Sequence, residues 1–347
     1  MIKTLALINA IGLSICASNV SAAAMILESK AITESVNIDG LQESVWDSAK
    51  VLNVKVNETP YKPNNGYNGI KETLVEMRSV YDAKHVYFLL SYADPTKSLA
   101  RFPWVKQEDG SWKKMIKKDQ TGHDNTYYED KVALIWDINQ KGFAKKGCTK
   151  SCHLPEDGLL DGVKDTSAGR HYTKPGETLD MWHWKSARTN VIFNMDDQYI
   201  NSDRSESKSW GRHGDTNTGG GYKNNHNADK TAPAYMNKMA SDEHKFWVLD
   251  SMKTKFVDTF KPGDVIGGVV AKAYTGSRAD ITARGEWKDG YWTLEIKRLL
   301  VTTGEKSNLQ DVQFTDLSES YAFGLTVFDN SQINHLFHKK AIKLKFK

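Results

Sequence analysis

The stretch "GEWKDGYWTLEIKRLL" (residues 285–300) holds two runs of alternating apolar and polar residues, separated by Lys-Asp-Gly. Alternation with a period of two is typical of a β-strand with one buried face. Asp-Gly between two such runs is a strong signal for a tight hairpin turn. This stretch therefore predicts an antiparallel β-hairpin in the C-terminal part of the chain.

Strand-like runs recur along the chain, each rich in β-branched and aromatic residues and bounded by Gly, Asp, Asn or Pro. Helical patterns are short and few, and "GLQESVWDSAK" (40–50) is the clearest. Strands and helices do not alternate as a doubly wound parallel sheet requires. The sequence predicts an all-β fold, an antiparallel β-sandwich with long loop and short helical insertions. The other strand-like runs are 85–94, 131–139, 245–250, 264–274, 319–329 and 340–346.

The N-terminus has the layout of a secretory signal peptide. Lys3 precedes an apolar run over residues 5–17, and small residues follow, ending in "VSAAA" (20–24). We expect a signal peptide over residues 1–23, so that Cys16 leaves with it. The apolar run is too short to span a membrane, and no later stretch reaches ~18 uninterrupted apolar residues. The sequence therefore predicts export to the periplasm without a membrane span.

The charge balance excludes one class of partner. The chain has 47 Lys and Arg against 43 Asp and Glu, a net charge of +4. Nothing resembles the basic stripe that neutralises nucleic-acid phosphates. The sequence also lacks a nucleophile elbow, a His-Glu-x-x-His motif and a phosphate loop. We therefore expect neither nucleic-acid binding nor a hydrolytic site.

The stretch "FAKKGCTKSCHLPEDG" (143–158) contains the two cysteines that remain after export, Cys148 and Cys152, followed directly by His153. Three interpretations compete. A disulfide fits the oxidising compartment, but a chain this long can bury an ample core without one. A zinc site has too few ligands nearby, because structural zinc ligands usually come as two separated pairs.

Covalent haem attachment is the interpretation we favour. In the common Cys-x-x-Cys-His signature, each thiol forms a thioether with the haem, and the histidine becomes the proximal iron ligand. The spacer here is three residues, so the motif is a longer variant. It predicts one haem c on Cys148 and Cys152, with His153 as proximal ligand. The Asp- and Gly-rich stretch 154–165 suggests calcium, but it lacks the spacing of a calcium loop, so calcium is the unfavoured alternative there.

The stretch "DMWHWKSAR" (180–188) is the richest source of a sixth iron ligand. If it is a strand, Met181, His183 and Lys185 point to one face, while Trp182 and Trp184 point to the other. We take His183 as the first candidate for the distal ligand, ahead of Lys185 and Met181. The two indoles either wall the haem pocket or lie in the core. Outside this stretch the candidates are His171, Met236 and an open site.

We expect one haem-binding domain over residues 24–347, with insertions at about 100–128 and 140–245. Within them, 100–128 and 201–232 are polar and irregular, and loops this long are usually functional or disordered. The second contains three consecutive glycines (219–221). Two interpretations stay open for it, a lid over the haem and a mobile surface loop.

Two sets of motifs carry a family resemblance. "VNIDGLQESVWDSAKVLNV" (36–54), "GYWTLEIKRLL" (290–300) and "YAFGLTVFDN" (321–330) resemble the β-sandwich of family 9 carbohydrate-binding modules and DOMON-like domains. "YYEDKVALIWDIN" (127–139), "GCTKSCH" and "DMWHWKSAR", in that order, resemble proteins related to the haem-binding subunit of ethylbenzene dehydrogenase. The likeness spans most of residues 33–346.

This resemblance implies a haem held between the sandwich and its insertions. It also implies electron transfer between a molybdenum/iron–sulfur oxidoreductase and a carrier. The enzyme subunits hold a non-covalent haem b between methionine and lysine, so the Cys-x-x-x-Cys-His motif departs from them and makes that partner doubtful. Other relatives are stand-alone periplasmic c-type cytochromes, which the motif suits better.

The sequence therefore predicts a periplasmic monohaem c-type cytochrome that transfers single electrons, as a shuttle or as the haem partner of a larger oxidoreductase. We expect an electron-transfer protein rather than a catalyst in its own right, with other periplasmic redox proteins as partners. One alternative is a haem-based sensor or ligand-binding module with an open sixth site. Another is a carbohydrate-binding sandwich whose cysteines form a disulfide.

Overall fold

The hairpin predicted from residues 285–300 is present. Strands β17 (Ile281–Lys288) and β18 (Tyr291–Leu299) pair antiparallel, joined by a two-residue turn. The turn residues Asp289 and Gly290 have φ values of 51° and 83°. Positive φ at both central residues is the geometry of a type I′ turn, whose twist matches that of the flanking strands.

The structure is a computed structural model that describes residues 25–150, 171–203, 211–239 and 245–347. Several predictions fall on residues outside these ranges: the signal peptide with Cys16, the pair Cys152 and His153, the stretch 154–165, and part of the polar segment 201–232.

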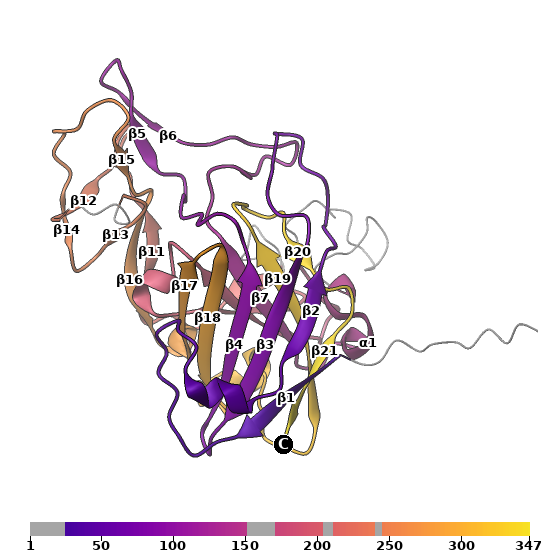
Figure 1. Ribbon diagram of the computed structural model, residues 1–347. Helices are drawn as coiled ribbons and strands as arrows, with labels where there is room; N and C mark the ends of the chain where they lie inside the picture. The colour runs from indigo at the N-terminus through magenta and orange to yellow at the C-terminus, as the bar shows by residue number, and fades with distance from the viewer. Residues whose placement is uncertain (1–24, 151–170, 204–210, 240–244) are drawn as a thin grey trace, which may run out of the picture.

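Thirteen strands of the described chain form one continuous sheet, which curls into the two layers of a β-sandwich (Figure 1). Their order is β10-β9-β8-β7-β19-β21-β1-β3-β4-β18-β17, with β2 paired to β3 and β20 paired to β19. The pairings are antiparallel except those of β1, which runs parallel to β21 and to β3. The predicted all-β sandwich is confirmed, with β1 as the departure from antiparallel pairing. The strands not yet given are β1 (Ile26–Ala31), β2 (Leu52–Val56), β3 (Thr73–Tyr81), β4 (His85–Ala93), β7 (Lys131–Asp137), β8 (Leu179–Lys185), β9 (Asp196–Ile200), β10 (Arg212–Gly214), β19 (Ser320–Phe328), β20 (Leu336–Phe337) and β21 (Ile342–Phe346).

Aromatic side chains fill the core between the two layers. The Phe88 ring of β4 lies 5.7 Å from that of Trp136 on β7 and 5.9 Å from that of Trp182 on β8. Trp184 packs edge-on against Trp292, with their ring centroids 5.0 Å apart. Fully burying a large apolar side chain such as Phe contributes roughly 1.5–3 kcal/mol. These contacts therefore hold the layers together and fix which side of β8 faces the core.

The outer side of each layer is also covered. On the first layer, Trp46 packs with Tyr87 and Leu89 of β4. On the second, Phe143 packs with apolar residues of β7 and β8. The helix predicted over residues 40–50 is only a short 3-10 segment, and no side chain caps its N-terminus. The helical segments are η1 (Ser44–Ser48), α1 (Phe143–Lys146), η2 (Gly147–Lys150), η3 (Asn190–Ile192), η4 (Ser277–Ala279) and α2 (Ser307–Gln310).

A lobe of short strands projects from one end of the sandwich (Figure 1). It contains the hairpin β5–β6 with β15 on its edge, and the pair β12–β14. Trp104, Trp112 and Ile266 form its small apolar cluster. A separate three-stranded sheet has the order β11-β16-β13. These strands are β5 (Trp104–Lys106), β6 (Trp112–Lys114), β11 (Gly219–Asn224), β12 (Tyr235–Asn237), β13 (Val248–Leu249), β14 (Lys253–Lys255), β15 (Val265–Ile266) and β16 (Val269–Thr275).

The segment 140–245, expected as an insertion, does not lie entirely outside the main sheet. Strands β8, β9 and β10 lie within it and extend the main sheet beyond β7. The glycine-rich part of 201–232 forms β11, which pairs with β16 through a bulge. A Cβ on Gly220 would lie 1.7 Å from the carbonyl oxygen of Ala273, so the two backbones approach too closely for any side chain. Polar composition concealed this strand, because its backbone rather than an apolar face makes the contact.

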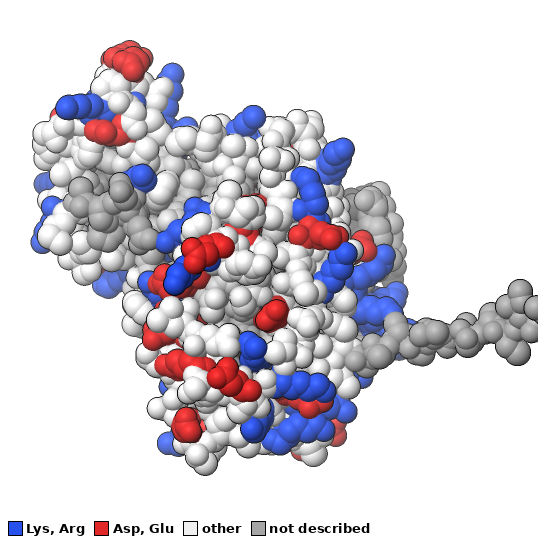
Figure 2. Space-filling model, viewed as in Figure 1, with Lys and Arg blue, Asp and Glu red and all other residues white. Residues whose placement is uncertain are grey.

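Two further features concern the surface and the helices. On the face shown in Figure 2, basic and acidic side chains are interspersed, as the balanced composition predicts. Among the residues that the structure describes, no helix is long and apolar enough to cross a membrane.

Candidate functional site

The residues singled out in the sequence meet on one face of the second layer. We call this the outer face: the side of β7, β8, β9 and β19 that points away from the core between the layers. Antiparallel register aligns Gly324 with Ile135, Ile135 with Met181, and Met181 with Gln198. Residues paired in this way point to the same face. His183 lies in the adjacent row of the same face, two residues along β8.

Cys148 lies against this face. It belongs to η2, and its side chain is completely buried. A Cβ on Gly324 would come within 2.2 Å of the Cys148 sulfur, so the glycine makes the space that the thiol fills. Met181 lies in the same row, two strands away, which corresponds to roughly 10 Å between backbones. Burial raises the pKa of the Cys148 thiol to about 12, so the thiol is neutral.

His183 is the buried histidine of this face. Its Nδ1 lies 3.0 Å from Nη2 of Arg212. Arginine can only donate, so Nδ1 accepts, and the ring hydrogen of the neutral imidazole sits on Nε2. Nε2 is buried and has no hydrogen-bond partner among the described residues. Burial, together with Lys185, Arg212 and other nearby cations, holds the pKa of His183 well below its usual range, so the ring is neutral.

Two buried ion pairs border His183. Lys185 pairs through Nζ with Asp196, which also accepts a 2.7 Å hydrogen bond from Nε of Arg278. Arg188 pairs through Nε with Glu129, whose other oxygen accepts hydrogen bonds from two backbone amides. As arranged here, Lys185 is an ion-pair partner rather than a neutral amine.

Two further cations on this face have no described carboxylate within ion-pair distance. Lys131 is buried and donates from Nζ to the carbonyl oxygen of Gln332 at 2.8 Å. Burial and nearby cations hold the pKa of Lys131 well below its usual range. Arg212 donates to Gln198 as well as to His183. The described part of the outer face thus carries more basic than acidic side chains, which favours an anionic group that would keep them protonated.

A second histidine, His335, reaches the same region and was missed by sequence reasoning. It lies in the chain that returns from β19, and its ring centroid is 4.6 Å from that of Phe328. His183 stacks on Phe328 as well, at 5.6 Å. Nδ1 of His335 lies 2.7 Å from the carbonyl oxygen of Ile333, so Nδ1 donates and Nε2 keeps its lone pair. No local motif marks this residue, because only the β19–β20 pairing brings it beside Phe328.

The remaining predicted candidates are distributed over three places. Met181 lies on the outer face in the apolar cluster that contains Phe143. Trp182 and Trp184 lie on the opposite side of β8, in the core between the layers. Met236 packs in the apolar cluster of the lobe. His171 begins the described chain after the gap and is partly buried.

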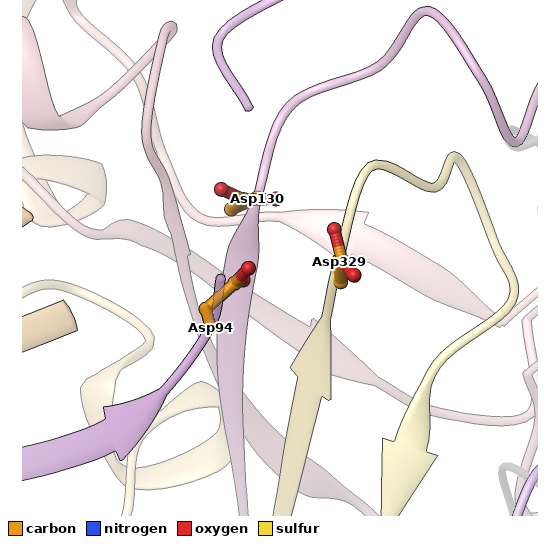
Figure 3. Close-up of side chains that lie close together, drawn as sticks. All are labelled: Asp94, Asp130 and Asp329. Carbon is orange, nitrogen blue, oxygen red and sulfur yellow. The ribbon is translucent and has the colours of Figure 1, made fainter. Parts of the chain in front are cut away.

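Away from the outer face, Asp94, Asp130 and Asp329 point toward one another where β4 and β19 end and β7 begins (Figure 3). Donors from the chain satisfy most of their oxygens. Asp130 accepts from the backbone amides of Ser98 and Asn330 and from an indole. Among these six oxygens, Oδ2 of Asp94 is the one buried without a partner. Burial and nearby Asp329 raise the pKa of Asp94 to about 7.

Fold and site together define a curled β-sandwich protein whose outer sheet face carries a buried cysteine, a buried and a half-buried histidine, and more basic than acidic side chains among the described residues. The family model for ethylbenzene dehydrogenase matches residues 43–340. The chain therefore belongs to the ethylbenzene dehydrogenase family. No curated protein sequence matches it.

Solved structures of carbohydrate-binding proteins show a distant likeness. A family 9 carbohydrate-binding module from Caldicellulosiruptor kristjanssonii, solved with glucose, has 9% identity and a TM-score of 0.34, with 93% of this chain and 95% of that chain covered. A putative carbohydrate-binding protein from Bacteroides uniformis has 10% identity and a TM-score of 0.33, with 94% and 100% covered. With TM-scores below 0.5, neither structure bears on the function of this chain.

Proposed function

We propose that this protein is an exported, periplasmic monohaem c-type cytochrome that transfers single electrons. The observation that carries the proposal is that Cys148 and His183 lie on one face of one sheet, in adjacent residue rows. Cys148 and Cys152 form the thioethers, His153 is the proximal ligand and His183 the distal one. When bound, the haem iron supplies the one-electron chemistry.

The residues of the outer face fit such a group. Nε2 of His183 is a buried nitrogen without a partner, a costly arrangement unless something else occupies the site. As an iron ligand, His183 needs its lone pair on Nε2, so Arg212 must release Nδ1. Haem propionates are anions, and Lys131 and Arg212, two basic side chains without a described carboxylate partner, are suited to them.

The chain's own residues then define the environment of the iron. The burial of Cys148, Met181 and His183 excludes water from that part of the face. Axial ligand type and burial are the main means by which a protein sets a haem potential. A second histidine ligand favours a low potential, and a methionine such as Met181 favours a higher one.

The tautomer of His183 supports a second candidate, a haem-based sensor or ligand-binding module with an open sixth site. With Arg212 on Nδ1, Nε2 is a hydrogen-bond donor rather than a ligand. A donor in this position stabilises a small molecule beside the iron without occupying the coordination site itself. Rapid binding of carbon monoxide to the reduced protein, without slow ligand displacement, supports this candidate over the first.

The proposed partners are periplasmic redox proteins, among which a molybdenum/iron–sulfur oxidoreductase is the one that family membership suggests. On the face shown in Figure 2, mixed charge offers docking contacts of both signs.

The test of the proposal is the reduced pyridine haemochrome spectrum of protein expressed with export and haem-attachment machinery. Acid–acetone extraction beforehand removes any haem that is not covalently bound. We expect a c-type spectrum with one haem per chain and a reversible one-electron redox titration. If no haem survives extraction, the two cysteines are not an attachment site and the proposal fails.

A further inference from the structure

Four buried aspartates converge on the core side of β8 and β9. Asp180 belongs to β8, Asp197 to β9, Asp215 follows β10 and Asp311 follows α2. None of the four is more than 3% exposed. One carboxylate oxygen each of Asp180, Asp197 and Asp311 lies within 4.8 Å of the other two. The Asp215 carboxyl group lies within hydrogen-bonding reach of Asp311. Burial, together with nearby Asp311 and Asp180, raises the pKa of Asp215 to about 9.

Most oxygens of this acidic cluster have no partner. Among the described residues, no donor group reaches either oxygen of Asp197 or of Asp215, nor Oδ1 of Asp180 or Oδ1 of Asp311, and all six oxygens are buried. Backbone or side-chain donors reach the remaining two, and the Val312 amide, for instance, donates to Oδ2 of Asp180 at 2.9 Å. A buried acceptor without a partner is costly, and more so when it is charged. Asp197 is thus a fully buried side chain without a donor partner in the described chain, and one of its oxygens converges with those of Asp180 and Asp311.

Arg298 lies beside this cluster, but its single guanidinium group does not neutralise the four carboxyl groups. Its Nη2 lies 3.7 Å from Oδ2 of Asp180 and 3.6 Å from Oδ1 of Asp311. Both distances are too long for hydrogen bonds, and Nε and Nη2 have no partner of their own. Its Nη1 donates to the Val312 carbonyl at 2.8 Å. One guanidinium group without a hydrogen bond to any of them is thus the basic group beside four carboxyl groups in this part of the described chain.

We propose that Asp180, Asp197, Asp215 and Asp311 together bind one calcium ion. The donor set consists of carboxylate oxygens, which hard cations prefer and which distinguishes the site from a zinc site with nitrogen or sulfur ligands. Calcium–oxygen bonds are about 2.3–2.6 Å long, so ligands on opposite sides of the ion are about 5 Å apart. The three oxygens of the triad, all within 4.8 Å of one another, are close enough to reach one ion.

The ion would fix the strands that carry the outer face. Asp180 and Asp197 alternate along β8 and β9 with Met181, His183 and Gln198, which point to the other side. A bound cation therefore joins the back of both strands to the segments after β10 and α2. Its role is to hold the outer face in register, whether or not that face carries haem.

Calcium binding to the full-length exported protein tests the proposal directly. After treatment with EGTA and gel filtration, isothermal titration with calcium chloride should show one strong site per chain. The thermal midpoint should rise by several degrees on adding 1 mM calcium, because a ligand that binds only the folded state stabilises it. A flat titration together with an unchanged midpoint overturns the proposal. Equal shifts with magnesium alone overturn the assignment to calcium.

Substitutions locate the ion. Asp215→Asn removes one charge at nearly constant shape, and it should weaken calcium binding at least tenfold while the protein still folds. Asp94→Asn is the matched control, because it neutralises a buried aspartate of the other acidic group (Figure 3). It should leave the calcium-dependent shift unchanged. A shift that survives Asp215→Asn and disappears in Asp94→Asn places the ion elsewhere and overturns the proposal.

Discussion

The two faces of β8 and β9 differ in whether their buried carboxyl groups have cationic partners. Asp196 and Asp197 are adjacent in sequence and therefore point to opposite faces. Asp196, on the outer face, has two cationic partners, Lys185 and Arg278, and its pKa lies well below its usual range despite burial. Asp197, on the core side, has no partner for either oxygen, and burial raises its pKa well above its usual range.

This difference shows what each face lacks. Among the described residues, the outer face has more basic than acidic side chains and a histidine nitrogen without a hydrogen-bond partner. Both features suit a group such as haem, which carries negative propionates and an iron that binds histidine. The core side has surplus carboxylates and one arginine, which suits a divalent cation. Thin β layers make this division possible, because successive side chains of a strand enter different environments.

The largest expected effect is on the outer face. Replacing both Cys148 and Cys152 by alanine should abolish covalent haem completely, because each thioether needs a thiol. The measurement is the pyridine haemochrome spectrum after acid–acetone extraction. Trp184→Phe, on the core side, is the control and should retain one covalent haem per chain. Covalent haem in the double variant would show that other residues hold it.

His183→Ala should change a low-spin haem to high-spin, because the iron loses its distal ligand. Absorption and electron paramagnetic resonance spectra of the oxidised protein report the spin state. His335→Ala is the matched comparison, a second histidine in contact with Phe328. A low-spin spectrum that persists in His183→Ala and disappears in His335→Ala would assign the ligand to His335.

The same substitution should destabilise the protein to very different extents at the two adjacent aspartates. Asp196→Asn should lower the free energy of unfolding by about 3–5 kcal/mol, because it leaves buried cations without their partner. In calcium-free buffer, Asp197→Asn should cost less than about 1 kcal/mol, because it removes a carboxylate that has no partner. Urea unfolding measures both. Equal losses would mean that the two faces do not differ as described.

A local effect on stability concerns the packing of Cys148 against Gly324. Gly324→Ala should destabilise the protein by about 1–3 kcal/mol, because a Cβ there meets the Cys148 sulfur at 2.2 Å. Cys148→Ala removes that sulfur, so the double variant should recover most of the loss. Unfolding of the two single variants and the double variant completes the cycle. An additive loss would show that the thiol does not lie against Gly324.

Local patterns predicted a large part of the molecule. The Asp-Gly turn and its alternating flanks set the β17–β18 hairpin, because both signals act between neighbouring residues. The same alternation predicted that Met181 and His183 share one face of β8 and that the two indoles share the other. Of the helix expected over residues 40–50, only the short 3-10 segment η1 is present, because a short helix is only marginally stable without a capping side chain.

By itself, the sequence determined the all-β class, the alternation of side chains along β8, and the Cys-x-x-x-Cys-His motif on which the haem proposal rests. Only the tertiary structure decided that Cys148 lies against Gly324, that His335 joins His183 at Phe328, and that four aspartates converge behind β8. The physical reason is distance along the chain: Asp180 accepts from the Val312 amide, 132 residues away. Short-range periodicity indicates the face of a strand to which a side chain points. Only the folded structure determines which side chains from distant parts of the sequence lie on that same face.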